Sequence, residues 1–241
     1  MFFLLIAMKF VGKCLLIEIS GKKILAVGDL HLGYEEALNR GGVFVSRKMY
    51  EEMIEEFDEV FERVGEVDEI VLLGDVKHVF GKILRQEWDD VLNLFDYFLK
   101  RCAKIVVVKG NHDKIIGPIV SKRERVEVKD FYIVKEFCFL HGDRDFEESC
   151  GKAIRCWIAG HGHPAVKLKE GLKVEKYKCF LVGRYCGREV VLMPSFFAYS
   201  EGSDPRENNL RYPWKFSLGK FDVKIVSEGL KVLDFGKLGK L

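Results

Sequence analysis

Several residue types and charge patterns that are typical of particular classes of protein are rare or absent in this chain. Among its 241 residues there is no threonine, Gln86 is the only glutamine, and 39 Lys and Arg residues nearly balance 37 Asp and Glu residues. With a net charge of only +2, the chain as a whole is not basic. Its charge therefore does not imply a nucleic-acid partner, although such a partner is still compatible with it. Few amides and a charged content of 32% are typical of proteins from hot environments.

Long hydrophobic runs and paired cysteines are also missing. The apolar start, residues 1–7, is too short to span a bilayer and has no basic flank before it, so we expect no membrane segment and no export. Seven cysteines without a Cys-x-x-Cys pair favour reduced thiols in the cytoplasm. Because neither a repeat nor a linker divides the chain, we expect one domain, 1–241, and we make no prediction of its oligomeric state.

Five short apolar runs each lead into a candidate ligand: 24–27, 70–73, 105–108, 137–140 and 157–159. Continuous runs of this kind are typical of strands buried on both faces, and open α/β sheets place their sites at the carboxyl ends of such strands. Apolar stripes at helical spacing in 49–64 and 88–99 predict helices, the first with Ser46 as its N-cap.

The rest of the chain has the alternation of antiparallel strands. Residues 13–27 predict a hairpin that turns at 21–22, and residues 221–235 predict another that turns near 228–229. Further antiparallel strands are expected after His163. The sequence therefore predicts an α/β fold of two stacked sheets with helices outside.

All six histidines lie inside five motifs: Gly28-Asp29-Leu30-His31, Gly74-Asp75-Val76-Lys77-His78, Gly110-Asn111-His112-Asp113, His141-Gly142-Asp143 and Gly160-His161-Gly162-His163. Histidines placed at random would mostly lie outside these motifs, so the pattern indicates that the histidines have a chemical role. Imidazole, carboxylate and amide groups together suit divalent Mn, Fe, Zn or Co. The motifs contain no cysteine, which argues against a structural zinc site.

Seven of these side chains are candidate metal ligands: Asp29, His31, Asp75, Asn111, His141, His161 and His163. They are too many for one tetrahedral ion and suit two ions, with the Asp75 carboxylate able to bridge them. Two ions about 3.5–4 Å apart form a clamp for in-line phosphoryl transfer by a shared hydroxide. We expect two Mn²⁺ ions, with Fe, Zn or Co as alternatives.

Two further histidines have other expected roles. His112 has no metal role left to fill, so it can donate a proton to the leaving oxygen, with Asp113 orienting it. His78 is left open between a contact to the ligands or phosphate and a capping role. The segment 194–214 is the hardest to interpret: a packed surface loop is favoured, and a wall over the metal site is the alternative.

Together, the five motifs from Asp29 to His163 resemble those of the calcineurin-like metallophosphoesterase superfamily. The resemblance implies a four-layer α/β/β/α sandwich of two mixed sheets flanked by helices. It also implies that His112 is catalytic. It assigns Asp29, His31, Asp75 and His163 to one metal, and Asp75, Asn111, His141 and His161 to the other.

Within the superfamily, the chain looks most like small archaeal phosphoesterases related to the SbcD nuclease, which are similar to a bacterial phosphodiesterase encoded beside a DNA ligase. We therefore expect a cytoplasmic enzyme that hydrolyses small phosphodiesters. The alternatives are an SbcD-related nuclease and a metal-binding scaffold without activity. The short chain after His163 lacks the added domain of the full nucleases, which argues against long duplex DNA as the substrate.

Overall fold

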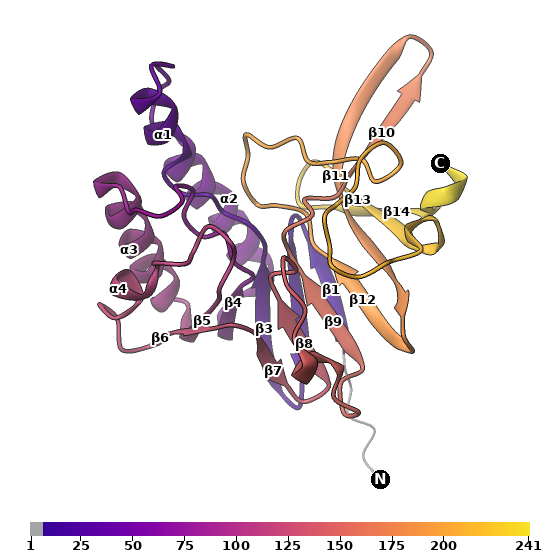
Figure 1. The fold of residues 1–241 in the computed structure, drawn as a ribbon, viewed down its shortest axis with the longest axis horizontal. Helices are drawn as coiled ribbons and strands as arrows, with labels where there is room; N and C mark the ends of the chain where they lie inside the picture. The colour runs from indigo at the N-terminus through magenta and orange to yellow at the C-terminus, as the bar shows by residue number, and fades with distance from the viewer. Residues whose placement is uncertain (1–6) are drawn as a thin grey trace.

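The computed structural model describes residues 7–241, and the apolar start considered above lies outside them apart from Ala7. Within the described range, the helices are all too short or too polar to span a bilayer. The chain forms two β-sheets that stack face to face, with the α-helices on the outer side of the first sheet (Figure 1).

The first sheet contains the three strands that lead into the first three motifs. It has six strands in the order β1-β2-β3-β4-β5-β6. The strand β2 pairs antiparallel with both β1 and β3, whereas β3 to β6 pair in parallel. The predicted runs and hairpin are confirmed here. The strands are β1 (Ala7–Val11), β2 (Cys14–Ile19), β3 (Lys22–Val27), β4 (Val67–Leu72), β5 (Cys102–Val108) and β6 (Val126–Lys129).

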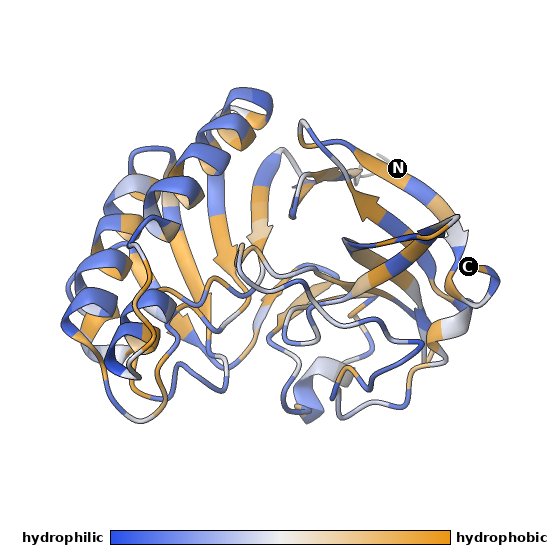
Figure 2. Cartoon of the chain, turned by 90° about the horizontal axis from the view of Figure 1, so that it is seen from above, coloured by the Kyte–Doolittle hydropathy of each residue, from blue (hydrophilic) through white to orange (hydrophobic). Residues whose placement is uncertain are grey.

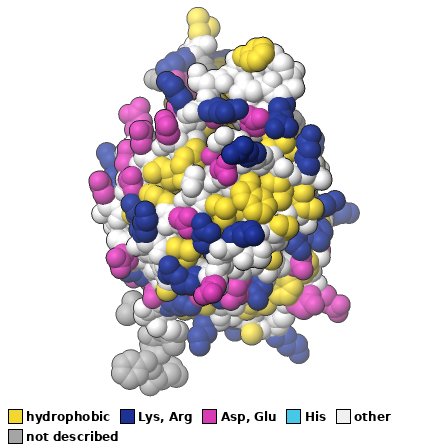
Figure 3. Space-filling view, turned by 90° about the vertical axis from the view of Figure 1, so that its left-hand side faces the viewer, with side chains coloured by type: hydrophobic (Ala, Val, Ile, Leu, Met, Phe, Trp, Pro, Cys, Tyr) yellow, Lys and Arg dark blue, Asp and Glu magenta, His cyan; other side chains and the backbone are white. Residues whose placement is uncertain are grey.

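Helices cover the outer face of this sheet: α1 (Tyr34–Arg40), α2 (Met49–Val64), α3 (Arg85–Leu99) and α4 (Gly117–Val120). Their apolar sides pack on the strands, as when Phe57 and Phe95 join the cluster around Ile105. Figure 2 shows the hydrophobic residues concentrated in the strands and on the sides of the helices that face them. On the opposite, outer side, Lys, Arg, Asp and Glu surround smaller groups of hydrophobic side chains (Figure 3).

The predicted helices are confirmed, but the cap of α2 is not Ser46. The helix begins at Met49 with Lys48 as its N-cap residue. The carboxylate of Glu35, in α1, accepts hydrogen bonds from the backbone N–H groups of Lys48 and Met49 at 3.0 and 3.2 Å. A carboxylate satisfies orphan N–H groups as well as a serine does, and its charge complements the helix dipole.

The second sheet holds the strands that lead into the last two motifs. Its order is β14-β13-β11-β12-β9-β8-β7, with β10 paired to the first part of β11 so that this hairpin projects from the sheet (Figure 1). The expected antiparallel strands and final hairpin are confirmed. The strands are β7 (Tyr132–Val134), β8 (Phe137–Leu140), β9 (Cys156–Ala159), β10 (Ala165–Glu170), β11 (Lys173–Tyr185), β12 (Arg188–Leu192), β13 (Asp222–Val226) and β14 (Val232–Lys237).

Three hydrophobic clusters separate the layers. One lies beneath the helices, a second fills the space between the sheets, and a third lies on the outer face of the second sheet. The α/β fold with two mixed sheets and helices is as predicted. In the described range, however, the outer layer of the second sheet is irregular rather than α-helical. Leu210, Trp214 and Phe221 cover it, with the short 3₁₀ helices η1 (Glu147–Cys150), η2 (Leu218–Lys220) and η3 (Leu238–Lys240).

Candidate metal centre

The two sheets bring their ligand-bearing strand ends to one place. The backbone of Leu73 donates to Val27 O at 2.8 Å, so the ends of β3 and β4 stay in register beyond the sheet. A Cβ added to Gly160, at the end of β9, would lie 2.8 Å from Asp29 Oδ2. The glycine therefore permits the close approach between the motif of the second sheet and that of the first.

Six of the seven predicted ligands form two compact clusters. Asp29, His31 and His163 make one, and Asp75, His141 and His161 make the other, with ligand atoms within 4.8 Å of one another in each. The donor set of imidazoles and carboxylates suits two divalent transition ions. The clusters are therefore consistent with a dinuclear metal site.

Asn111, the seventh predicted ligand, belongs to the second cluster by position. Its Oδ1 lies 3.0 Å from His141 Nε2, and His161 Nδ1 lies 3.2 Å from the same nitrogen. The other ring nitrogen of His141, Nδ1, donates to Leu73 O at 2.7 Å. A carbonyl on one ring nitrogen fixes the tautomer that leaves the other nitrogen free to bind a metal.

Asp75 lies between the two clusters. Its Oδ2 is 3.5 Å from His141 Nε2, 3.8 Å from His31 Nε2 and 3.7 Å from His112 Nε2. This central place suits the bridging role expected for its carboxylate. The role itself stays a prediction.

The protonation of Asp75, His161 and His31 suits a cation. At His141, burial acts to lower the pKa, but the carboxylates of Asp75 and Asp29 outweigh this effect and raise the pKa. Burial raises the pKa of Asp75 to about 7, and the nearby carboxylates of Asp29 and Asp113 add to the effect. Burial lowers the pKa of His161 to about 4 and that of His31 well below its usual value, so both imidazoles are neutral at pH 7. Neutral imidazoles bind metals, and a divalent ion would favour the ionised form of Asp75.

Backbone strain is concentrated at the predicted ligands. Ten non-glycine residues of the described chain have positive φ, and five of them are predicted ligands: Asp29, His31, Asp75, His161 and His163. Side chains with a Cβ seldom adopt this conformation, which costs about 1–3 kcal/mol per residue. The strand-end turns therefore place the predicted ligands at a cost in backbone energy.

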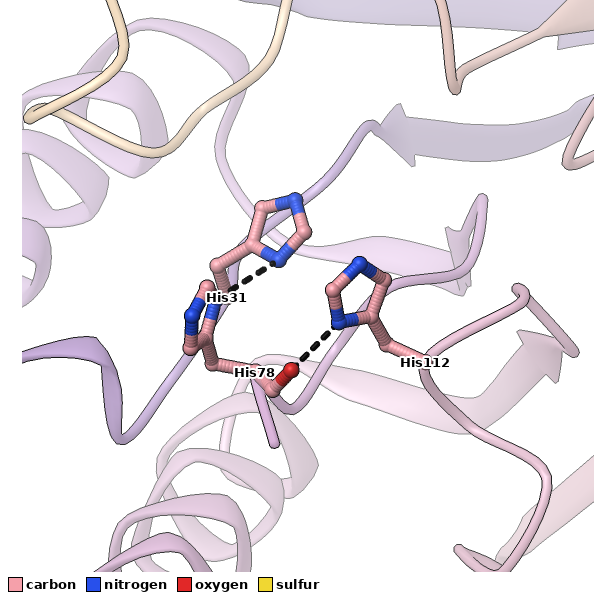
Figure 4. Close-up of side chains that lie close together, drawn as sticks. All are labelled: His31, His78 and His112. Carbon is pink, nitrogen blue, oxygen red and sulfur yellow. Dashed lines mark hydrogen bonds between the residues drawn. The ribbon is translucent and has the colours of Figure 1, made fainter. Parts of the chain in front are cut away.

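His112 is fixed by its neighbours rather than by a carboxylate on its ring. Its Nδ1 donates to the carbonyl of His78 (Figure 4). Its ring centroid lies 3.7 Å from that of Phe80. Because a carbonyl only accepts, Nδ1 carries the proton and Nε2 is the nitrogen that faces Asp75. Burial and the nearby Lys77 charge lower the pKa of His112, and the carbonyl of His78 opposes this effect.

Asp113 was expected to orient His112 and is placed differently. Its carboxylate accepts hydrogen bonds from the backbone N–H groups of Val76, Lys77 and Gly110, each at 3.2 Å. These bonds fix the turns after β4 and β5 to each other. An effect of Asp113 on the His112 ring therefore passes through the backbone.

His78 lies in the site, beside a ligand. Its Nδ1 is 3.4 Å from His31 Nδ1, and His31, His78 and His112 form a third compact group (Figure 4). His31 turns its other nitrogen, Nε2, towards Asp75. Of the roles left open by the sequence, contact with a ligand is the one that this geometry favours.

A buried carboxylate that the sequence analysis missed holds the loop after Asp75. Glu87, in the first turn of α3, is fully buried and accepts hydrogen bonds from the backbone N–H groups of His78, Val79 and Leu84 at 3.1, 2.6 and 2.7 Å. The buried ammonium of Lys77 donates to the carbonyl of Val79. Glu87 is the third residue of its helix, where an acidic side chain often accepts a hydrogen bond from the backbone N–H of the N-cap residue. This position was the only signal in the sequence for its role.

The segment 194–214 divides into a packed part and an exposed part. Phe196 and Phe197 are buried, and their backbone N–H groups donate to Gly28 O and Asp29 O at 2.8 and 3.0 Å. The later part, residues 203–212, is called the wall here. Tyr212 ends it, donating its hydroxyl to Gly160 O at 2.6 Å and accepting from Gly162 N at 3.2 Å.

The wall and the histidines line one open cavity of about 680 Å³. His31, Asp75, Asn111 and His112 face it from the strand ends, and Phe80 lies at its edge. The wall contributes Ser203, Asn208, Asn209, Leu210 and Arg211. Both expectations for 194–214 therefore hold in part, since one portion is packed and the other borders the site.

Comparison with known proteins gives the following matches. The family model described as calcineurin-like phosphoesterase matches residues 22–184, more than half of the chain. No curated protein matches. Among solved structures, the chain is similar to the nuclease MPE of Pseudomonas putida, with 17% identity, a TM-score of 0.64, and coverage of 96% of this chain and 100% of that one.

A phosphoesterase from E. coli is also similar, with 12% identity, a TM-score of 0.42, and coverage of 89% of this chain and 98% of that one. At such identities, likeness to a solved structure concerns the fold alone. The family match covers the five motifs and the strands that carry them. The chain therefore belongs to the calcineurin-like phosphoesterase family.

Proposed function

We propose that the protein is a metal-dependent phosphodiesterase that hydrolyses small phosphodiesters. The observation that carries this proposal is the pair of His and Asp clusters on one open cavity, with His112 beside both. Two divalent ions bound there would neutralise phosphate charge and activate water. Mn²⁺ is the proposed ion and the cytoplasm the proposed compartment.

The side chains of the site would have different roles in the reaction. Asp29, Asp75 and the histidines of the two clusters would hold the ions and, through them, the phosphate. His112, with its Nδ1 proton fixed on the carbonyl of His78, has only Nε2 to take up a proton and pass it to the leaving oxygen. Hydrolysis then adds water across one P–O bond and gives a monoester and an alcohol.

The form of the cavity supports a diester over a monoester. A diester carries one negative charge and two substituents, so its site needs room on both sides of the phosphate and few cationic side chains. The cavity is open, and among its described lining residues Arg211 is the only Lys or Arg. The amides of Asn208 and Asn209 provide neutral contacts on the wall.

A nuclease is the second candidate. The similar structure from Pseudomonas putida is named a nuclease. An SbcD-related nuclease is also an alternative expected from the motifs. Nuclease activity would use the same centre on a longer substrate. The net charge of +2 supports small or single-stranded substrates over duplex DNA, which requires several phosphate contacts.

The proposal is tested with purified protein stripped of metal and then loaded with Mn²⁺. The kcat/KM for an aryl phosphodiester should exceed that for the matching monoester, and turnover should disappear in the metal-free sample and return on reloading. Duplex and single-stranded DNA are assayed beside them. A clear monoester preference would overturn the diesterase, whereas efficient, strongly salt-sensitive duplex cleavage would favour the nuclease.

A further inference from the structure

Phe80 presents an aromatic ring to water beside the catalytic histidine. The side chain is 57% exposed, yet one face of the ring packs on His112 with planes at 34° and centroids 3.7 Å apart. Phe80 lines the same cavity as His31 and Asp75. An aromatic ring held at the edge of a polar cavity is a surface on which a flat, partly apolar group can stack.

Arg211 brings a cation to that cavity from the wall. Its side chain is exposed and lines the cavity. Its φ is +60°, a conformation rare outside glycine, and its backbone N–H donates to Asn209 Oδ1 at 2.9 Å. The planar guanidinium fork is suited to a phosphate.

The wall that carries Arg211 is tied at both ends to the motif of His161 and His163. At its start, Ser203 N donates to His163 O at 2.8 Å. At its end, the Tyr212 hydroxyl donates to Gly160 O at 2.6 Å. The backbone that carries Arg211 is therefore anchored beside the candidate metal centre, which reduces the backbone entropy lost on binding.

We propose that Phe80 and Arg211 form a nucleotide subsite beside the metal centre. A base next to the scissile phosphate stacks on Phe80, and a second phosphate, one that is not cleaved, binds Arg211. The substrate class is a short single-stranded nucleotide chain with at least two phosphates, because a base must be unpaired to stack on a side chain. This inference rests on the proposed diesterase function and names its substrate.

The first test compares two dinucleotides that differ only in a 5′ phosphate. The wild type should prefer the phosphorylated one in kcat/KM by about tenfold, the size of one charge-assisted hydrogen bond. Arg211→Gln should bring this ratio close to one. Lys215→Gln is the matched control, because Lys215 is an exposed cation shortly after the wall that does not line the cavity. Taking a ratio cancels changes in folding or metal content.

The second test concerns the ring. Phe80→Leu keeps an apolar side chain but removes the aromatic face. Two substrates are compared by kcat/KM: a dinucleotide, and the same chain without the base on its leaving group. The preference for the dinucleotide should fall in Phe80→Leu. Phe44→Leu is its control, since Phe44 is 90% exposed and lies outside the cavity. A preference that survives in Phe80→Leu overturns the stacking half of the proposal.

Binding provides a readout that does not need turnover. A fluorescently labelled, 5′-phosphorylated single-stranded oligonucleotide is titrated onto His112→Ala protein at several salt concentrations. Adding Arg211→Gln should reduce the slope of log K against log salt by about 0.7, the value for one lost phosphate contact. An unchanged slope, or a dinucleotide ratio unchanged in Arg211→Gln, overturns the subsite. If the wild type cleaves no diester at all, the proposed function fails, and the salt slope alone then decides the subsite.

Discussion

The strand ends and the wall meet at one cavity but are built in different ways. Asp29, Asp75 and Asn111 follow buried parallel strands, and hydrogen bonds between the turns fix their backbone. Arg211 lies on an irregular segment held by contacts far apart in the sequence. A rigid sheet edge suits the predicted metal ligands, which need fixed geometry, whereas exposed positions of a loop can change to suit the substrate.

The largest expected effect is at the strand ends. Asp75→Asn should lower turnover by more than about 10²-fold while the protein stays folded, because the lost charge weakens both metal positions. Turnover, metal content and the thermal melting curve are measured together. Near-normal turnover with two metals bound would remove the bridging role and, with it, the clearest difference between the strand ends and the wall.

His112→Ala should cost the chemical step about 10²–10⁴-fold and leave the metals in place. The loss should shrink for esters with very good leaving groups, which need no proton. Elemental analysis and a series of aryl esters check both points. Metal loss would make His112 a ligand, and an equal loss for every leaving group would indicate electrostatic stabilisation.

Glu87 supports the strand side from outside the cavity, so its effect should be intermediate. Glu87→Gln removes one charged acceptor from the loop that orients His112, and turnover should fall by about 10- to 100-fold. Because the defect concerns proton donation, the loss should be greater for poor leaving groups than for good ones. Asp89→Asn, an exposed change on the same helix, is the control. A loss independent of the leaving group would mean that Glu87 serves stability alone.

Tyr212 links the wall to the metal motif, so its removal tests how separate the two regions are. Tyr212→Phe should weaken metal binding by about tenfold, since the hydroxyl holds Gly160 and Gly162 around His161. The measurement is a competition titration with a chelator. Tyr185→Phe, away from the cavity, is the control. Unchanged metal affinity would mean that the wall can be altered without consequence for the metals.

The smallest effect concerns pH and stability at the packed part of the segment 194–214. Lys178 donates to Ser195 O and Oγ, at 2.9 and 3.2 Å, and burial lowers its pKa to about 7, with the Lys13 charge adding to the effect. From pH 7 to the ordinary lysine pKa near 10.5, the unfolded chain binds more protons, so this group makes stability rise with pH. Lys178→Met should flatten that rise in denaturant unfolding, and Lys176→Met should not.

The motifs and strands could be predicted because their signals are local. A buried strand followed by glycine and a ligand appears in a few neighbouring residues, as in 70–75, and parallel strands bring such ends together. The cap of α2 by Glu35, the placement of Asp113 on backbone amides and the contact between Tyr212 and Gly160 depend on residues distant in the sequence. A pattern within one segment carries no information about such pairs.

The positive φ angles of five predicted ligands have a consequence for how the chain tolerates change. A glycine at position 163 would relieve the strained backbone, although glycine itself makes the unfolded chain more flexible. Without metal, His163→Gly should therefore cost less stability than an ordinary histidine-to-glycine change, while it removes a ligand. Selection for stability and selection for activity thus act in opposite directions at these turns, and only the bound metals favour keeping the strained residue.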